Sequence, residues 1–313
     1  MVNVLAGLEK LKADLRAAPL FAEVSEAGID ILMRAAVRVR IKPFENLIVS
    51  DDPDSGTLGE DALLILTSNL TVDLREFQRT HVYEAGAHIG ERSWMGQGGR
   101  MMSISSGDAE TGAGIRIESV IGELSTEDQF QVGLNALAHS RLLDDNCRLE
   151  AASLDATDVA ADLELRDLAT ELAKQMNLQE FSARDDEQIQ PVPGHVFFGL
   201  TGRLDVFANE WGLLLSTITL PNFAFEVSGA GGTPTAKVRA RNGVRGYWIP
   251  LKAAHDGFNI FAQTVLLQAV MVSHDAKLGL ANEQVRHVGL STAAPVEAGL
   301  FERLAGLFRN RVR

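Results

Sequence analysis

The sequence predicts a mainly β protein with flanking helices, built as two halves that repeat one order of elements. Short apolar runs bounded by Gly, Pro, Asn and Asp occur in both halves, which is typical of a β-sandwich or barrel rather than a parallel α/β sheet. In each half a short helix comes first, a run of strands follows, and a helix closes the unit. An acidic, mainly helical stretch over residues 144–190 separates the two. We therefore expect two β domains in tandem.

The first half opens on an amphipathic helix over residues 3–15 and a helix over 25–36 whose N-cap is Ser25. From residue 37 the apolar period changes from that of a helix to that of a strand. Residues 96–114, which are rich in Gly and Ser, give weak signals. The remaining patterns predict strands at 37–41, 47–49, 62–66, 70–74 and 115–121, and a closing helix at 126–143.

The second half shows the same rhythm from residue 190 onward, with Gly, Pro and Asn between its apolar runs. The helix that follows these runs, over residues 257–273, is apolar on more than one face. We expect it to bury against another domain or subunit, and therefore expect the chain to self-associate. The runs themselves predict strands at 195–200, 203–207, 213–220, 236–240 and 247–251.

These patterns divide the chain into four segments, because the acidic stretch interrupts the strand rhythm and the last residues change character again. The segments are a first domain over 1–145, a helical acidic linker over 146–177, a second domain over 178–278, and a tether with a terminal helix over 279–313. The charges of the linker are expected to form a solvated face.

The charge balance excludes some partners. Acidic side chains outnumber basic ones 42 to 29, which gives a formal net charge of −13 over 313 residues. A surface of this sign repels polyanions, so we expect no nucleic-acid partner. The one cysteine, Cys147, excludes an intrachain disulfide framework and fits a reducing compartment. Residues 1–21 lack the apolar core of a signal peptide and no window approaches ~20 apolar residues, so we expect a cytoplasmic protein.

No constellation of residues indicates catalysis. The seven histidines lack the spacing of metal ligands, and no GxSxG, Walker or Rossmann motif occurs. Only 40 residues follow Ser273, and they lack the pattern of a DNA-recognition helix. We expect a protein that is not an enzyme, with no catalytic residue and no metal site.

Several segments of the first half follow one another in a distinctive order. Pro19-Leu20-Phe21 is followed by a strand pair over 62–74, then by Gly86-Ala87-His88-Ile89-Gly90-Glu91, and Arg100 stands nine residues past Glu91. This order resembles the cyclic-nucleotide-binding domain, the β-jelly-roll module of bacterial catabolite-activator-type regulators and of kinase regulatory subunits. The second half resembles it again at 196–207, 221–226 and 234–240, so the resemblance implies two such rolls in tandem.

The resemblance implies a cyclic-nucleotide site in the first half, formed by Gly90, Glu91, Arg100 and Ser103. A cyclic phosphate needs backbone N–H donors from a glycine-rich turn and a guanidinium, and a glutamate accepts from the ribose 2′-hydroxyl. The two methionines after Arg100 depart from the family's small residues. The alternative is an Arg100 that lies on the surface or pairs internally, with no cofactor bound.

The second half departs further from the family's phosphate-binding cassette. Phe225 replaces the cassette glycine, and Pro234 or Thr235 stands where the arginine would be. Since neither neutralises a phosphate, Glu226 would repel one. We expect Glu226 to be hydrogen-bonded structurally, and the second copy to be a degenerate scaffold.

The end of the chain is basic and amphipathic within an otherwise acidic protein. An in-plane membrane helix, a helix docked in a partner's groove, and a helix packed on its own domain all fit this pattern. The residues that we expect to bind a partner or a membrane are Leu300, Phe301, Leu304, Leu307, Phe308 and Arg309.

The sequence thus favours a non-enzymatic structural or regulatory protein that acts through protein–protein contacts. One alternative is a cyclic-nucleotide-responsive regulator that binds its ligand in the first domain. The other is an adaptor recruited by its C-terminal helix to a membrane surface, which would make the protein peripheral to the inner membrane.

Overall fold

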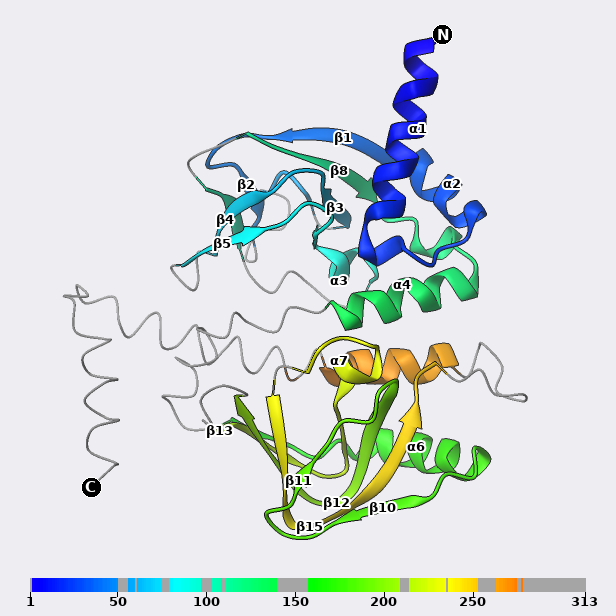
Figure 1. Cartoon of the computed structure of the whole chain (residues 1–313), viewed down its shortest axis with the longest axis vertical. Coiled ribbons are helices and arrows are strands. Elements are labelled where there is room, and N and C mark those ends of the chain that lie inside the picture. The colour runs from blue at the N-terminus through cyan, green and yellow to red at the C-terminus, as the bar shows by residue number, and fades with distance from the viewer. Residues whose placement is uncertain are drawn as a thin grey trace, which may run out of the picture.

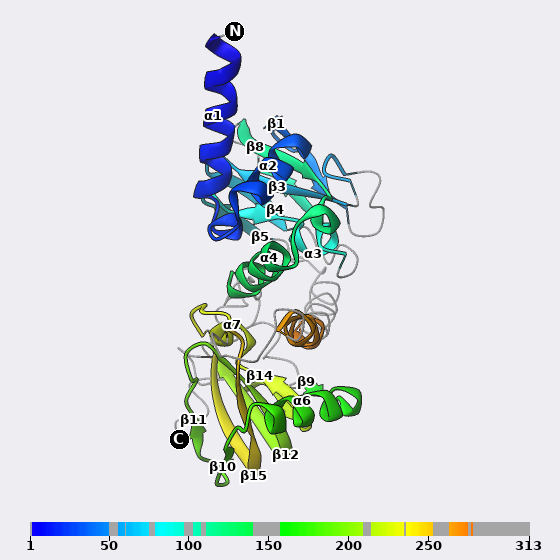
Figure 2. The same ribbon diagram turned by 90° about the vertical axis from the view of Figure 1, so that its right-hand side faces the viewer.

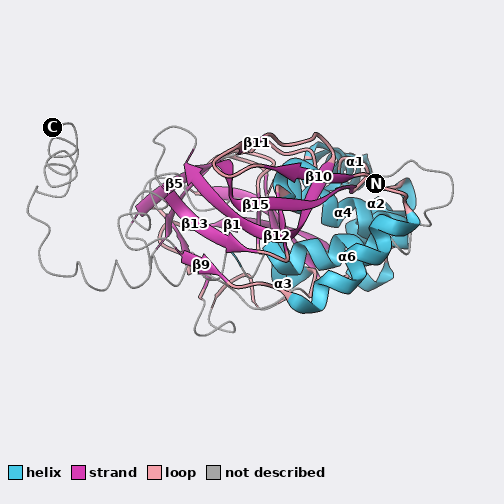
Figure 3. Cartoon of the chain, turned by 90° about the horizontal axis from the view of Figure 1, so that it is seen from below, coloured by secondary structure: helices cyan, strands magenta, loops and turns pink. Residues whose placement is uncertain are grey.

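The computed structural model describes residues 2–49, 56–59, 61–74, 79–96, 103–107, 111–139, 157–208, 214–234, 236–252, 263–274 and 277 (Figure 1). Strands form a β-roll in each half, and the two rolls lie one above the other in two perpendicular views (Figures 1 and 2). Seen from below, the helices gather on one side of the strands (Figure 3). The predicted fold class, mainly β with flanking helices and two rolls in tandem, is confirmed.

The first roll consists of two four-stranded antiparallel sheets, ordered β1-β8-β3-β6 and β2-β7-β4-β5. Strand β3 is buried at every position, because Leu64 and Leu66 face the interior of the roll while Leu63 and Ile65 face the helices. This double burial explains the uninterrupted apolar run. The strands are β1 Ala36–Ile41, β2 Asn46–Ile48, β3 Ala62–Leu66, β4 Leu70–Leu74, β5 Arg79–Tyr83, β6 His88–Ile89, β7 Ile104–Ser106 and β8 Gly112–Glu118.

Helices flank the first roll at its beginning and end. The predicted N-cap is confirmed, since the Ser25 hydroxyl accepts from the Gly28 N–H at 3.0 Å. Strand character was predicted over residues 115–121, but the strand ends at Glu118 and a short 3₁₀ turn follows. The helical elements are α1 Val2–Ala17, η1 Pro19–Phe21, α2 Glu26–Ala35, α3 Glu91–Trp94, η4 Ile121–Glu123 and α4 Thr126–Ala138.

The second roll is one seven-stranded sheet with the path β10-β15-β12-β13-β9, in which β11 pairs with β15 and β14 with β12. Helix α6 (Leu163–Gln175) and the short helix α7 (Glu226–Gly229) flank it. The strands are β9 Thr157–Val159, β10 Glu180–Ala183, β11 Gln188–Ile189, β12 His195–Ala208, β13 Leu214–Thr219, β14 Asn222–Ala224 and β15 Ala236–Pro250.

The prediction of separate strands at 195–200 and 203–207, and at 236–240 and 247–251, was wrong. Each pair is one long strand, β12 and β15, that bends where a turn was expected. Gly202 has φ +99°, and a Cβ there would lie 2.5 Å from the Gly243 carbonyl oxygen. The glycines let the two paired strands bend in close contact, with register shifts on either side of Thr201, instead of ending them.

Part of the expected linker belongs to the second sheet. Strand β9, at residues 157–159, pairs in parallel with β13, and the Asn222 side-chain amide donates to the Ala160 carbonyl at 3.0 Å. Helix α6 confirms the helical character of this segment, while residues 140–156 lie outside the described part of the chain. The boundaries 1–145, 146–177, 178–278 and 279–313 remain a proposal.

The two halves share one apolar core. Buried side chains of α1, α2 and α4 form a single cluster with Val196, Phe198 and Phe223 of the second roll and with the helix over residues 263–274. In both perpendicular views α4 lies between the rolls, above that helix and α7 (Figures 1 and 2). The closing helices therefore bury their apolar faces against each other within one chain. Their apolar character is no longer an argument for self-association.

Gly133 sets the distance between these helices. A Cβ at this position would lie 3.2 Å from Leu267 Cδ2 and 3.4 Å from Met271 Sδ. We expect Gly133→Leu to lower the free energy of unfolding by about 1–3 kcal/mol through overpacking. Urea unfolding checks this, with Gly7→Leu as the control because a Cβ at Gly7 has no neighbour within 4 Å. Equal stabilities of the two variants would contradict a tight contact between the halves.

Candidate functional site

In the first cassette, the structure describes the turn from β6 into α3. Strand β6 ends at Ile89, Gly90 adopts a left-handed conformation with φ +90°, and Glu91 begins α3. A residue with a Cβ would be strained at this φ, which accounts for the glycine. The chain thus turns sharply from strand to helix, and Glu91 lies in the first turn.

Helix α3 is only four residues long and is held by its neighbours. The buried Trp94 ring donates from Nε1 to the Glu118 carbonyl at 3.0 Å, and the Ser119 hydroxyl donates to the Trp94 carbonyl at 2.8 Å. The ring also meets Phe21 of η1 edge-on, with centroids 6.1 Å apart. The cassette is therefore fixed to the end of β8 and to the turn that precedes α2.

The structure places the four predicted ligand-binding residues only in part. Gly90 and Glu91 stand together at the start of α3, and the buried Ser103 directly precedes β7. Arg100 lies outside the described residues. The site formed by Gly90, Glu91, Arg100 and Ser103 therefore remains a prediction.

The second cassette repeats the backbone of the first. Phe225 follows β14 with a left-handed φ of +64°, and Glu226 then begins α7 as Glu91 begins α3. In both helices the N–H of the residue after the helix bonds to the glutamate carbonyl, from Met95 and from Ala230. A bulky residue in this conformation costs about 1–2 kcal/mol, so the surrounding structure must hold it there. The resemblance between the two halves thus extends to individual dihedral angles.

Phe225 fills space in the second roll that a glycine would leave open. Its ring lies 5.3 Å from Trp248, whose own ring lies 5.0 Å from Phe197 and 6.1 Å from Phe181. Phe225 and Trp248 pack against the core of this roll. Aromatic side chains therefore occupy the side of the cassette that faces the interior of the barrel.

Glu226 is buried and paired, as the sequence analysis expected. Lys277 donates to its carboxylate and also to the Phe223 carbonyl, and both side chains of the pair are nearly buried. Burial raises the pKa of Glu226, but the charges of Lys277 and His274 and the hydrogen bond from Lys277 outweigh it and hold the pKa below its ordinary 4.5. The carboxylate is therefore ionised and already engaged within the chain.

A second contact ties the helix over residues 263–274 to the second cassette. The Ser273 hydroxyl donates to the Asn222 side-chain oxygen at 3.1 Å, and both residues are buried. The sequence analysis missed Lys277 and Ser273 because they lie 51 residues from their partners and no motif links them.

The C-terminal residues predicted to bind a partner or a membrane lie outside the described part of the chain. They are Leu300, Phe301, Leu304, Leu307, Phe308 and Arg309, and their role remains a prediction. No described helix combines the length and the hydropathy needed to cross a membrane.

Comparison with known proteins gives similarity to solved structures alone, since no family model and no curated protein matches the sequence. One similar structure is the regulatory domain of Toxoplasma gondii PKA with cAMP, at a TM-score of 0.33 and 13% identity, covering 87% of this chain and 97% of that one. Another is a regulatory subunit of a cAMP-independent protein kinase A from Trypanosoma cruzi bound to guanosine. Its TM-score is 0.32 and its identity 11%, and the match covers 78% of this chain and 81% of that one.

A third is a regulatory subunit of a cAMP-independent protein kinase A from Trypanosoma brucei, at a TM-score of 0.32 and 12% identity, covering 86% of this chain and 87% of that one. At these scores the similarity carries no argument about function. The assignment of two rolls with repeated cassettes rests on the strand order and backbone geometry of this chain.

Proposed function

We propose that this chain is a non-enzymatic regulatory protein of cyclic-nucleotide-binding-like architecture that acts through protein–protein contacts. The observation that carries the proposal is the Lys277–Glu226 pair in the second cassette. The glutamate that would accept from a ribose hydroxyl is neutralised by the chain itself, so this roll has a structural role.

The shared core supports the same proposal. Because α4 of the first half packs on the helix over 263–274, and that helix is bonded to the second cassette, the second roll serves as a fixed support for the first. A fused pair of rolls of this kind presents a rigid surface to a partner, which suits a scaffold or regulatory subunit.

Titration calorimetry of the full chain with cyclic mono- and dinucleotides tests the proposal. We expect no saturable heat. In the second cassette Lys277 already occupies the Glu226 carboxylate, and the first cassette departs from the family's pattern after Arg100. Tight binding that is lost in Arg100→Ala would contradict the proposal. It would establish instead a cyclic-nucleotide-responsive regulator.

That second candidate function has one observation in its favour. In the first cassette a glycine, Gly90, adopts the left-handed conformation and Glu91 begins α3. In the second cassette Phe225 stands in place of the glycine. If a nucleotide binds, we propose that it does so in the first roll alone, at one site per chain.

A further inference from the structure

A cavity of about 390 Å³ opens beside the first roll, and neither Gly90 nor Glu91 is among its lining residues. Its walls come from β5, the turn into β6 and His88 of β6, and from Pro19 of η1 and His139 at the end of α4. This volume lies within the usual range of small-molecule pockets. Since the cavity joins the roll to both flanking helical elements, a ligand here would contact all three.

The turn that forms one wall is rigid. The Gly86 N–H donates to the Leu66 carbonyl at 2.7 Å, and the Leu66 N–H donates to the Ala87 carbonyl at 2.8 Å. The Ala85 N–H donates to the Asn69 side chain at 3.0 Å, and Gly86 has φ +88°. The pocket is therefore preformed by backbone bonds and does not depend on loop closure.

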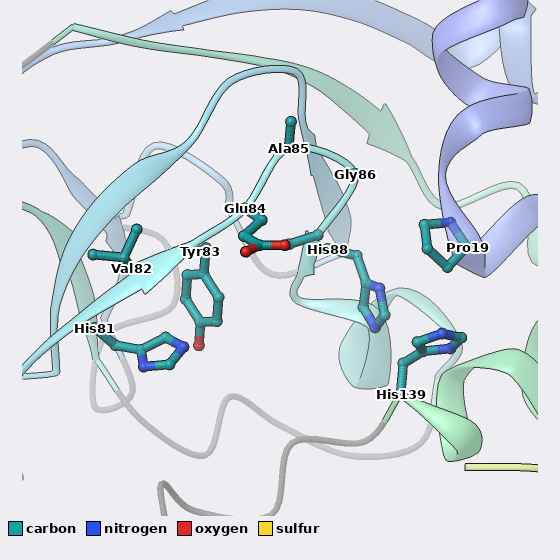
Figure 4. A pocket seen from close by; sticks show the side chains of 10 residues that line it. Pro19, His81, Val82, Tyr83, Glu84, Ala85, Gly86, His88 and His139 are labelled. Carbon is teal, nitrogen blue, oxygen red and sulfur yellow. The ribbon is translucent and has the colours of Figure 1, made fainter. Parts of the chain in front are cut away.

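Two pairs of aromatic rings and one carboxylate line this pocket. His81 and Tyr83 meet edge-on with centroids 4.8 Å apart, and His88 and His139 meet at 6.5 Å. Glu84 lies between the two pairs (Figure 4). It is the one carboxylate among the described lining residues, and none of these is a lysine or an arginine.

The hydrogen bond of His139 adds an acceptor to the pocket. Its Nδ1 lies 2.8 Å from the Asn135 carbonyl, which can only accept, so the neutral tautomer that keeps this bond has its acceptor at Nε2. A carboxylate and an imidazole acceptor, with aromatic rings beside them, suit a planar cation that offers several N–H donors. A metal ion is the poorer fit, because no group of three described His, Cys, Asp or Glu residues is placed to hold one.

We propose that this cavity binds a small organic cation of the guanidinium class. Its N–H groups would bond to Glu84 and its plane would lie against the rings of Tyr83 and the histidines. Neither Gly90 nor Glu91 lines the cavity, which shares Gly86, Ala87 and His88 with the segment that leads into them.

Calorimetric titration of the full chain with n-butylguanidine, and with the neutral isostere n-butylurea, tests the proposal. We expect saturable binding of one n-butylguanidine per chain and at least tenfold weaker binding of n-butylurea. Glu84→Gln should weaken n-butylguanidine at least tenfold, and His139→Ala should weaken it severalfold.

Glu123→Gln is the matched control, because it removes an exposed acid of the same half outside the cavity. Its affinity for n-butylguanidine should equal that of the unaltered chain. Equal binding of the two compounds, an undiminished affinity in Glu84→Gln, or no saturable binding would each overturn the proposal. Circular dichroism of Glu84→Gln confirms that the variant is folded.

Discussion

Lys277→Ala is expected to lower the free energy of unfolding by about 3–5 kcal/mol, because it leaves the buried Glu226 carboxylate without its cation. The Phe223 carbonyl loses a donor in the same variant. Urea unfolding followed by fluorescence measures the loss. Lys252→Ala is the matched control, since its salt bridge to Glu23 at 3.0 Å is half-exposed and should contribute at most about 1 kcal/mol.

Removing both partners separates the charge effect from the packing effect. We expect the double variant Lys277→Met with Glu226→Gln to recover much of the stability that Lys277→Ala loses, because no buried charge remains unpaired. The double variant should also be less sensitive to acid. If Lys277→Ala and Lys252→Ala are equally stable, the pair does not hold the cassette.

The acid dependence follows from the direction of the pKa shift. The folded-state pKa of Glu226 lies below its ordinary 4.5, so the pair's stabilisation is fully present above pH 4.5 and is lost as the pH falls through the folded pKa. A ¹³C NMR titration of the Glu226 carboxyl should give a value below 4.5 in the unaltered chain and a higher one in Lys277→Ala.

Asp128→Ala is expected to lower the free energy of unfolding by about 3 kcal/mol, since one carboxylate joins the N-termini of two helices. Asp128 accepts from the Ser25 N–H at 2.7 Å, the Ser25 hydroxyl at 2.8 Å and the Ser125 hydroxyl at 2.9 Å. Ser25 caps α2 and Ser125 caps α4, so the side chain holds both helices together. Thermal and urea unfolding measure the effect.

Glu127→Ala is the control, because Glu127 is an exposed acid in the same turn of α4. Burial raises the pKa of Asp128, but the three hydrogen bonds from Ser25 and Ser125 and the charge of Arg16 leave it below its ordinary 3.8. Its stabilisation is therefore complete above pH 3.8 and is lost as the pH falls through the folded pKa. An Asp128→Ala variant within 0.5 kcal/mol of Glu127→Ala would contradict this role.

Periodicity predicted the elements whose burial is one-sided or complete. The apolar run at 62–66 and the cap at Ser25 are in place, because local pattern and tertiary burial agree there. Strand β5 (Arg79–Tyr83) was missed, because its first three residues are all polar and give no apolar alternation. The segment is a strand because it pairs with β4. The bends at Gly202 and Asn242-Gly243 were mistaken for turns because sequence alone does not show that two glycines face each other.

The candidate site could be predicted only where its residues are neighbours in the sequence. Gly90 and Glu91 are adjacent and lie where the motif placed them, and the degeneracy at Phe225 was visible in the residue itself. The partner of Glu226 was not visible, because Lys277 lies 51 residues further along the chain and only the fold brings the two side chains together. The apolar faces of the closing helices were recognised, but their partner within the chain required the fold.

The most direct test of the claim that the second roll has a structural role is a calorimetric titration of Arg100→Ala with cAMP and cGMP, because any binding that survives the loss of the first cassette's arginine belongs to the second roll. The account predicts no saturable heat, since Lys277 holds Glu226 and Phe225 packs against Trp248. Saturable binding that Glu226→Ala abolishes would contradict it.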